Sequence, residues 1–205
     1  MSSKFNEINR SSILITLSII TVFSIILIID HVDGNLAFGL FHENPILPVA
    51  VESEFLTYDD LITGFSMKYP RDWDRAQHVD KSVTFHAPKE SNSDINPAGL
   101  GIMVTRLGPN TTLASITQNQ LDTLKKLYPD FQIQISVETI FLEHPAHKIV
   151  FTATDKTQTL RKAMQIWFRE DTKAYLVTYK SDNERFSKYL PIIDRMLNSF
   201  YTYKN

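Results

Sequence analysis

The sequence predicts an α+β domain, an antiparallel sheet with helices packed on it, preceded by one transmembrane helix. Several strand-like segments are joined by connections that are too short for parallel neighbours. Two further segments repeat apolar residues at helical spacing. An uncharged apolar run stands near the N-terminus. The predicted division is a cytoplasmic tail, a transmembrane anchor, a linker and one folded domain, in residues 1–12, 13–29, 30–53 and 54–205.

Composition limits the function classes. The chain has 205 residues, of which 43% are hydrophobic and 21% are charged, and its net charge is −2. Because nucleic-acid binders usually carry a basic face, this balance argues against a nucleic-acid partner. The chain has no cysteine. Disulfides, thiolate zinc sites and cysteine nucleophiles are therefore excluded.

The predicted anchor, Ile13 to Ile29, contains no charge, proline or glycine. With Ser11 and Ser12 the uncharged run reaches 19 residues. At about 1.5 Å per residue such a helix just spans a hydrocarbon core of roughly 30 Å. The run has no polar face at the helical period, which disfavours a buried core helix. We therefore expect contact with the lipid bilayer.

The flanking charges predict the orientation of the anchor. Lys4 and Arg10 precede it, whereas Asp30 and Asp33 follow it and the next basic residue is Lys68. By the positive-inside rule, the N-terminus stays in the cytoplasm and the domain lies on the extracytoplasmic side. The predicted localisation is a single-pass membrane protein.

The same features also fit a signal peptide. Asn35-Leu36-Ala37 ends in a small residue but has asparagine where cleavage sites prefer a small residue. We expect an uncleaved anchor and keep a cleaved signal as the alternative. Residues 30–53 contain Gly34, Gly39, Pro45 and Pro48 without sustained periodicity, which is typical of a linker.

The first half of the domain shows three strand patterns. Residues 64–69 alternate apolar and polar side chains and end at Pro70, and residues 83–87 do the same and end at Pro88. Residues 100–107 are apolar on both sides, as expected of a central strand that is covered on both faces.

A helix is predicted from about Thr112 to the residue before Pro129, followed by a long strand over 132–142. In this strand Ile133, Ile135 and Val137 are expected to share one face. The alternation slips at Thr139, which suggests a bulge there.

Three more strands are expected at 147–154, 159–169 and 174–180. Short polar connections, of which one is His144-Pro145-Ala146, join them. Residues 131–180 are therefore predicted to form a four-stranded antiparallel meander.

A capping box, Ser181 to Glu184, is predicted to open the last helix, whose apolar stripe runs from Phe186 to Phe200. Pro191 lies inside this stripe. We expect it to kink the helix or to start a second one, because proline fits only a first turn without cost.

Both ends of the domain resemble a known family. Phe55-Leu56-Thr57-Tyr58 is followed by Gly64-Phe65-Ser66-Met67-Lys68-Tyr69-Pro70-Arg71-Asp72-Trp73. This stretch is similar to the opening of PsbP-like domains, which have a short strand and then a G-F-x-x-x-Y-P-x-x-W segment. Residues 175–179 and the helix that ends in Ser199-Phe200 resemble the close of those domains. The resemblance covers about residues 55–201.

The resemblance implies an α/β/α sandwich around an antiparallel sheet and a role that is largely non-enzymatic. The best-known members of the family are lumenal accessory subunits of photosystem II, which help to retain calcium and chloride at the manganese cluster. Fold alone does not carry that role to this chain. The resemblance indicates a membrane-anchored prokaryotic relative of the photosystem II subunit, with no role assigned to it.

One pair of residues has the character of metal ligands. His144 and His147 flank a predicted Pro-Ala turn next to Glu143, and imidazoles on a tight turn can converge on a divalent metal. The alternative is a pair of solvated histidines. Residues 92–96 look like the start of a calcium loop, but Pro97 and Met103 stand where that loop needs glycine and glutamate.

No nucleophile-elbow, zinc-protease or phosphate-loop motif is present. A hydrolase that uses Asp59, Asp60 or His86 is the least favoured hypothesis, because paired aspartates here are typical of a turn. Trp73 and Trp167 are expected in the core. The basic residues Arg161, Lys162, Arg169 and Lys173 are expected on a solvated face, with contact to an acidic partner as the alternative.

The leading functional hypothesis is therefore a non-catalytic, membrane-tethered accessory or assembly module that binds a membrane protein complex. We expect no catalytic residues and no cofactor. The alternative hypothesis is a domain that binds a small ligand or a divalent metal, through residues 89–98 or through His144 and His147.

Overall fold

The computed structural model describes residues 54–92, 94–156 and 158–203. Two antiparallel sheets and two helices form this part of the chain. The larger sheet has seven strands in the order β3-β4-β5-β9-β8-β7-β6. In chain order its strands are β3 Asp74–Gln77, β4 Val83–His86, β5 Gly99–Arg106, β6 Gln132–Phe141, β7 His144–Thr154, β8 Leu160–Glu170 and β9 Lys173–Ser181. The smaller sheet has the order β1-β2-β10, with strands β1 Phe55–Asp60, β2 Phe65–Pro70 and β10 Tyr201–Thr202.

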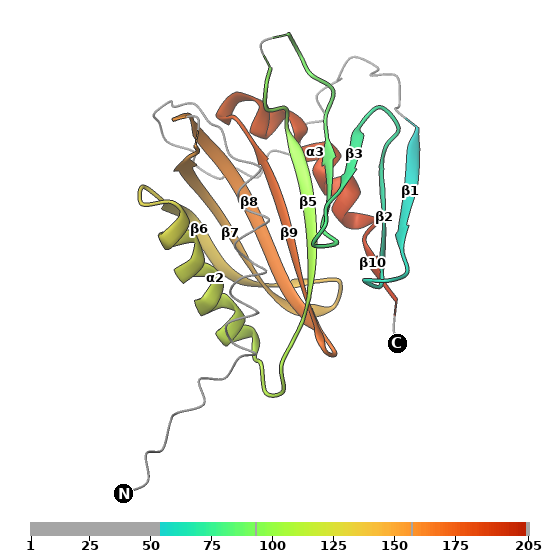
Figure 1. Cartoon of the computed structure of the whole chain (residues 1–205), viewed down its shortest axis with the longest axis vertical. Helices are drawn as coiled ribbons and strands as arrows, with labels where there is room; N and C mark the ends of the chain where they lie inside the picture. Colours follow the sequence, from blue (N-terminus) through green and yellow to red (C-terminus); the bar gives the residue numbers. More distant parts are fainter. Residues whose placement is uncertain (1–53, 93, 157, 204–205) are drawn as a thin grey trace, which may run out of the picture.

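The two helices, α2 Leu113–Leu127 and α3 Asn183–Asn198, lie on opposite faces of the seven-stranded sheet (Figure 1). Each face has its own hydrophobic core, because side chains alternate across a strand. The core under α3 also includes the small sheet, whereas the core under α2 includes Trp167. The predicted α+β fold with helices packed on an antiparallel sheet is confirmed. The expectation of one long sheet is wrong, because β1 and β2 pair with β10 instead of joining it.

The predicted meander is confirmed, since β6, β7, β8 and β9 are neighbours in chain order. The first connection lies earlier than predicted. Leu142 and Glu143 have φ of 51° and 66°, the backbone of a two-residue hairpin turn, and β7 already begins at His144. The segment His144-Pro145-Ala146 is therefore strand and not turn.

The predicted bulge exists in β6 but at another residue. The register shifts between Ile133, which pairs with Phe151, and Ile135, which pairs with Val150. From Ile135 to Phe141 the pairing is regular, so the slip expected at Thr139 is wrong. The extra residue places Ile133 on the opposite face from Ile135, and the predicted common face is also wrong.

The cap of α3 lies one residue later than predicted. Asp182 is the N-cap and accepts a hydrogen bond of 2.7 Å from the Arg185 amide, whereas Ser181 is the last residue of β9. The helix is continuous through Pro191, so a second helix does not start there. Pro191 and Ser187 both lie on the exposed side. Water can therefore satisfy the Ser187 carbonyl, which lacks its helical partner.

Trp73 and Trp167 are buried, as predicted. The core under α3 closes around Phe200, just after the helix. Its ring stacks on Phe65 at a centroid distance of 5.1 Å and meets Tyr175 edge-on at 6.1 Å. This contact joins the C-terminal end of α3 to both sheets.

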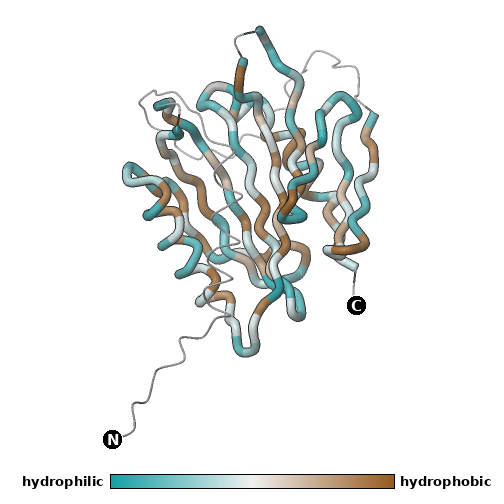
Figure 2. The backbone as a smooth tube through the Cα atoms, in the orientation of Figure 1, coloured by the Kyte–Doolittle hydropathy of each residue, from teal (hydrophilic) through white to brown (hydrophobic). Residues whose placement is uncertain are grey.

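Figure 2 shows that apolar residues recur along the inner strands of the large sheet. The predicted anchor, linker and cleavage site all lie outside the described residues. Within residues 54–203, apart from 93 and 157, no helix is long and apolar enough to span a bilayer.

Candidate functional site

The histidines predicted as metal ligands are not brought together. Because β7 already begins at His144, the two residues are three apart on a strand and point to opposite faces. The His144 ring stacks on Phe168, under α3, at 5.6 Å. The His147 ring stacks on Trp167, under α2, at 5.1 Å. Elsewhere in the described part of the chain, no group of three His, Cys, Asp or Glu residues is placed to hold a metal ion.

The loop between β4 and β5, which contains the calcium-like segment, is fastened to α3. The Asp94 carboxylate forms a salt bridge with Arg185. Lys188 Nζ lies 3.0 Å from Glu90 Oε1, and the Tyr189 hydroxyl donates to the same oxygen at 2.9 Å. Burial alone raises the pKa of Asp94, but the hydrogen bonds from Arg185 and from backbone amides lower it below its usual value. The Asp94 carboxylate therefore has a structural role, since it holds the loop against α3.

The three residues of the hydrolase hypothesis do not converge. Asp60 closes the turn between β1 and β2, where its Oδ1 accepts hydrogen bonds from the Ile62 and Thr63 amides at 3.0 and 2.9 Å. Asp59 accepts a hydrogen bond of 2.6 Å from the Tyr203 hydroxyl. His86 lies on β4 and faces the other side of the large sheet, toward α2.

A different group of residues draws together on the face that carries α2. On β9, Lys180 pairs with Gly99 of β5 on one side and with Ala163 of β8 on the other. Gly99 in turn pairs with His86. Lys180 therefore stands between two residues with little or no side chain. In the next row along the strands, a glycine again lies beside a polar residue of β9, since Gly101 pairs with Thr178.

Lys180 is buried, and no hydrogen bond offsets the burial of its amine. The residue is 6% exposed, and its Nζ has no hydrogen-bond partner among the described residues. Burial lowers the pKa of Lys180 well below its ordinary value, and the nearby Arg161 lowers it further, whereas Asp155 acts in the opposite direction. Burial of an amine without a partner costs several kcal/mol by general estimates, on the order of 2–7.

Arg161 is also inside, at 4% exposure. The expectation that it belongs to a solvated basic face is wrong. Its NH1 donates to the Asn96 carbonyl at 3.3 Å, and its Nε finds no partner in the described ranges. Burial lowers the pKa of Arg161 to about 10. Two basic side chains therefore lie under the α2 face, with the buried carboxylate of Asp155 near both and that of Asp94 near Arg161.

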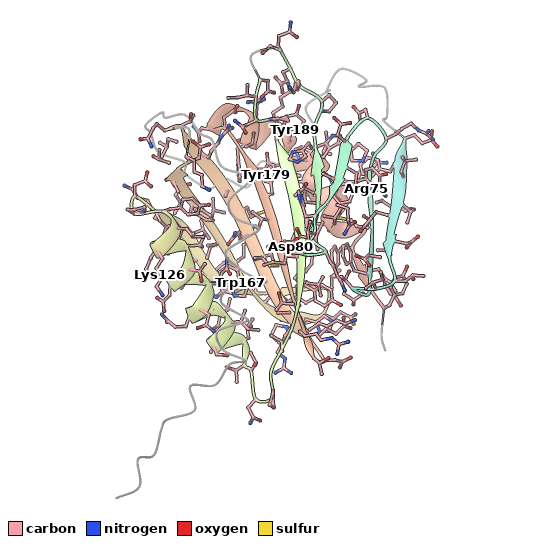
Figure 3. All side chains as sticks on the ribbon, viewed as in Figure 1. Arg75, Asp80, Lys126, Trp167, Tyr179 and Tyr189 are labelled. Carbon is pink, nitrogen blue, oxygen red and sulfur yellow. The ribbon has the colours of Figure 1, made fainter. Side chains whose placement is uncertain are left out.

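Two cavities open on this face. One of about 40 Å³ is lined by Lys180, His86, Gly99, Gly101 and apolar side chains. The other, of about 430 Å³, lies between α2 and strands β5, β8 and β9. Met103 and Leu176 line both, so the two cavities are adjacent. Trp167 points from β8 toward α2, where its Nε1 donates to Thr117 Oγ1 at 2.8 Å (Figure 3).

One feature of the sequence points to this site, but the strand pattern alone was not enough to recognise it. Leu176, Thr178 and Lys180 alternate on one face of a strand predicted as part of the meander. Lys180 stood at the predicted strand end, where a lysine is usually solvated. Its burial depends on Gly99 and Ala163, which come from other strands.

A second feature lies on the far edge of the sheet. Strand β6 pairs with β7 alone in the described structure, and Ile133, Ile135 and Val137 are 43%, 42% and 46% exposed. Ile140 is 67% exposed. The strand contains one charged residue, Glu138, and no proline or lysine. Sheet edges are usually protected by such residues.

The model of the protein family described as PsbP-like protein matches residues 15–202 of this chain. The chain belongs to the PsbP-like family. The predicted resemblance is thereby confirmed, and the matched range extends N-terminal to the described domain. No curated protein matches the chain.

Several solved structures share the PsbP-like fold. Cyanobacterial PsbP from Synechocystis sp. PCC 6803 is 13% identical, with a TM-score of 0.58 over 77% of this chain and 97% of that chain. LpqN of Mycobacterium tuberculosis is 10% identical, with a TM-score of 0.56 over 74% and 91%. Mog1p of Saccharomyces cerevisiae is 8% identical, with a TM-score of 0.52 over 73% and 96%. At these identities the likeness shows the fold alone.

Proposed function

We propose that this PsbP-like chain is a non-catalytic, membrane-tethered accessory module that docks on a membrane protein complex. The observation that carries the proposal is the outer edge of β6, which is exposed, largely apolar and has one charged residue. The partner contributes an extended segment that adds to the sheet as a further strand. Main-chain hydrogen bonds supply affinity in such an arrangement, and alternate side chains supply specificity.

The side chains of β6 suit an apolar partner strand. Ile135 and Val137 lie on the face that carries α3, and Ile133 and Ile140 lie on the other. Since Glu138 is the one charged residue in β6, the partner meets little charge to desolvate. A long apolar edge of this kind favours pairing with another chain.

The proposed tether makes a weak interface sufficient. An anchor at residues 13–29 confines the domain to the membrane surface, which raises its effective concentration near membrane partners. Two proteins with the same fold have related descriptions. Mog1p is described as a Ran-binding protein, and LpqN as involved in cell envelope biogenesis. Both descriptions are compatible with a role in binding other proteins.

Site-specific photo-cross-linking tests the docking edge. A benzophenone amino acid replaces Val137 in the full-length chain, and cross-linking is done in native membranes. The matched control carries the same probe at Val79, which is apolar, fully exposed and outside β6. We expect a discrete cross-linked membrane protein from position 137 and none from 79. The same products from both positions, or none from 137, would refute the docking edge.

The tether and its orientation can be tested separately. Because the chain has no cysteine, a single introduced cysteine is a unique label. Ser3→Cys and Val79→Cys are treated with a membrane-impermeant maleimide in intact cells. We expect labelling at position 79 alone, and at position 3 only after permeabilisation. Loss of an N-terminal tag from the mature chain would instead show a cleaved signal.

A further inference from the structure

The amine of Lys180 is buried and has no hydrogen-bond partner among the described residues. In the rows that cross the sheet at this point, polar groups are otherwise satisfied. Gln120 of α2 donates to Gln165 Oε1 at 3.1 Å, and Gln165 donates to Thr178 Oγ1 at 3.2 Å. On this face of the sheet, Lys180 Nζ and Arg161 Nε are the exceptions. Buried polar groups in folded proteins are as a rule hydrogen-bonded, so an orphan at a cavity needs an explanation.

The surroundings of Lys180 favour an anionic ligand group of small size. Arg161 is a buried cation nearby, and His86 lies across Gly99. A Cβ at Gly99 would lie 3.1 Å from His86 Nδ1, so the glycine is what lets the imidazole approach the strand. Asp155 lies near both basic side chains, and Asp94 and Asp182 lie near Arg161, so the positive charge is limited. A single carboxylate therefore complements the site better than a dianion such as phosphate does.

The rest of the site favours a long apolar body. From Lys180 the wall continues along Thr178 and Leu176 of β9 to the cavity beneath α2. The span from Lys180 to Ala174 is six residues of strand, or about 20 Å. The larger cavity, of about 430 Å³, lies in the range that is usual for ligand sites. Trp167 lines the cavity beneath α2, at the opposite end of the path from Lys180.

We propose that this face binds an unbranched monocarboxylate amphiphile, such as a fatty acid. The carboxylate accepts a hydrogen bond from Lys180 Nζ, and the hydrocarbon chain runs past Met103 and Leu176 to the cavity beside Trp167. Binding supplies the amine with the partner that the described residues do not give it. The site is distinct from the β6 edge and does not depend on the proposed docking.

A matched pair of variants makes the proposal testable in the full-length chain, reconstituted in lipid nanodiscs. The chain has two tryptophans, so Trp73→Phe leaves Trp167 as the sole tryptophan, which is excited selectively over the tyrosines. The probe is 12-bromododecanoate, whose bromine quenches only a nearby indole. Lys180→Met removes the amine and keeps an apolar side chain of similar length. Lys162→Met is the control, because Lys162 points to the other face, over the Phe186 ring.

We expect saturable quenching of Trp167 in the Trp73→Phe background and with Lys162→Met. A hydrogen bond to a charged group is worth enough to weaken binding about tenfold to hundredfold when Lys180 is replaced. The alcohol 12-bromododecanol, which lacks the carboxylate, is expected to bind the unaltered chain more weakly than 12-bromododecanoate does, by a similar factor. Partitioning of the probe into the nanodisc is the same for every variant, so it cancels in the comparison.

Two results would overturn the proposal. One is quenching that does not saturate or is equal with and without Lys180. The other is saturable quenching that appears only after Asp30, Asp33, Glu43 and Glu52 are changed to amides. That result would mean that an acidic side chain of the linker already pairs with Lys180, and the groove would then hold a segment of this chain.

Discussion

Replacement of Lys180 by methionine is expected to stabilise the fold and to remove part of its pH dependence. In the folded state, burial holds the pKa of Lys180 well below its ordinary value. In the unfolded chain the amine titrates near its usual pKa of about 10.4. As the pH falls below that value, the unfolded chain takes up a proton that the folded chain does not. The free energy of unfolding of the unaltered protein therefore falls as the pH falls.

The magnitude follows from proton linkage. Where Lys180 is neutral in the fold and protonated in the unfolded chain, stability changes by about 1.4 kcal/mol per pH unit. The charged groups that influence Lys180, Arg161 and Asp155, are unchanged by the substitution and cancel in the difference between the two proteins. Near neutral pH, removal of a buried donor that has no hydrogen-bond partner is worth about 1–3 kcal/mol. This advantage shrinks as the pH rises toward about 10.

Urea unfolding of the full-length chain and of Lys180→Met, followed by tryptophan fluorescence from pH 7 to pH 10, measures this difference. Lys162→Met is the control, since Lys162 is only partly buried and contacts the Phe186 ring. We expect no comparable gain from it. A Lys180→Met protein that is less stable than the unaltered chain at pH 7.5 would refute the reasoning. So would a difference between the two proteins that does not change with pH.

Three further changes test the fold. Phe200→Ala removes the ring that joins α3 to both sheets and should cost about 3–5 kcal/mol in urea unfolding, whereas a loss below about 1 kcal/mol would contradict this packing. Gly64→Ala should cost about 1–2 kcal/mol, because Gly64 has a φ of 88° and an added Cβ would lie 2.5 Å from Lys173 Nζ. Gly108→Ala, where the nearest atom lies at 3.8 Å, should lower the melting temperature less. Asp182→Ala removes the N-cap of α3 and should cost about 0.5–2 kcal/mol, seen as a lower melting temperature.

The local parts of the fold could be predicted because they depend on neighbours in sequence. Short connections predicted the meander, and the helical periodicity that begins near Thr112 predicted α2. The pairing of β2 with β10 joins residues 65–66 to 201–202. Such distant pairing leaves no trace in a local pattern.

The error in β6 has a different cause. Alternation predicts a face only where one side of a strand is buried, and β6 is exposed on both. Ile133, Ile135, Val137 and Ile140 therefore gave no reliable register. The same apolar residues that obscured the bulge at Gln134 are the ones that make this edge a candidate for docking.

The candidate ligand site was missed for a related reason, since the burial of Lys180 depends on residues from other strands. The histidine pair shows the opposite error. Proline between His144 and His147 favoured a turn that would bring the imidazoles together, but the positive φ angles of Leu142 and Glu143 place the turn earlier. Once the segment is strand, a spacing of three separates the two rings by the thickness of the sheet.

The two proposals rest on side chains and not on the PsbP-like scaffold, and they fail independently. The edge depends on β6, and the groove on Lys180 at β9, with β7 and β8 between them. Lys180→Met should therefore leave cross-linking from position 137 unchanged. Ile135→Lys, which adds a charge to the edge, should abolish the cross-link and leave the quenching of Trp167 intact, and Ile62→Lys should affect neither. If either substitution affects both readouts, one partner covers both surfaces, and the separation of the two sites is wrong.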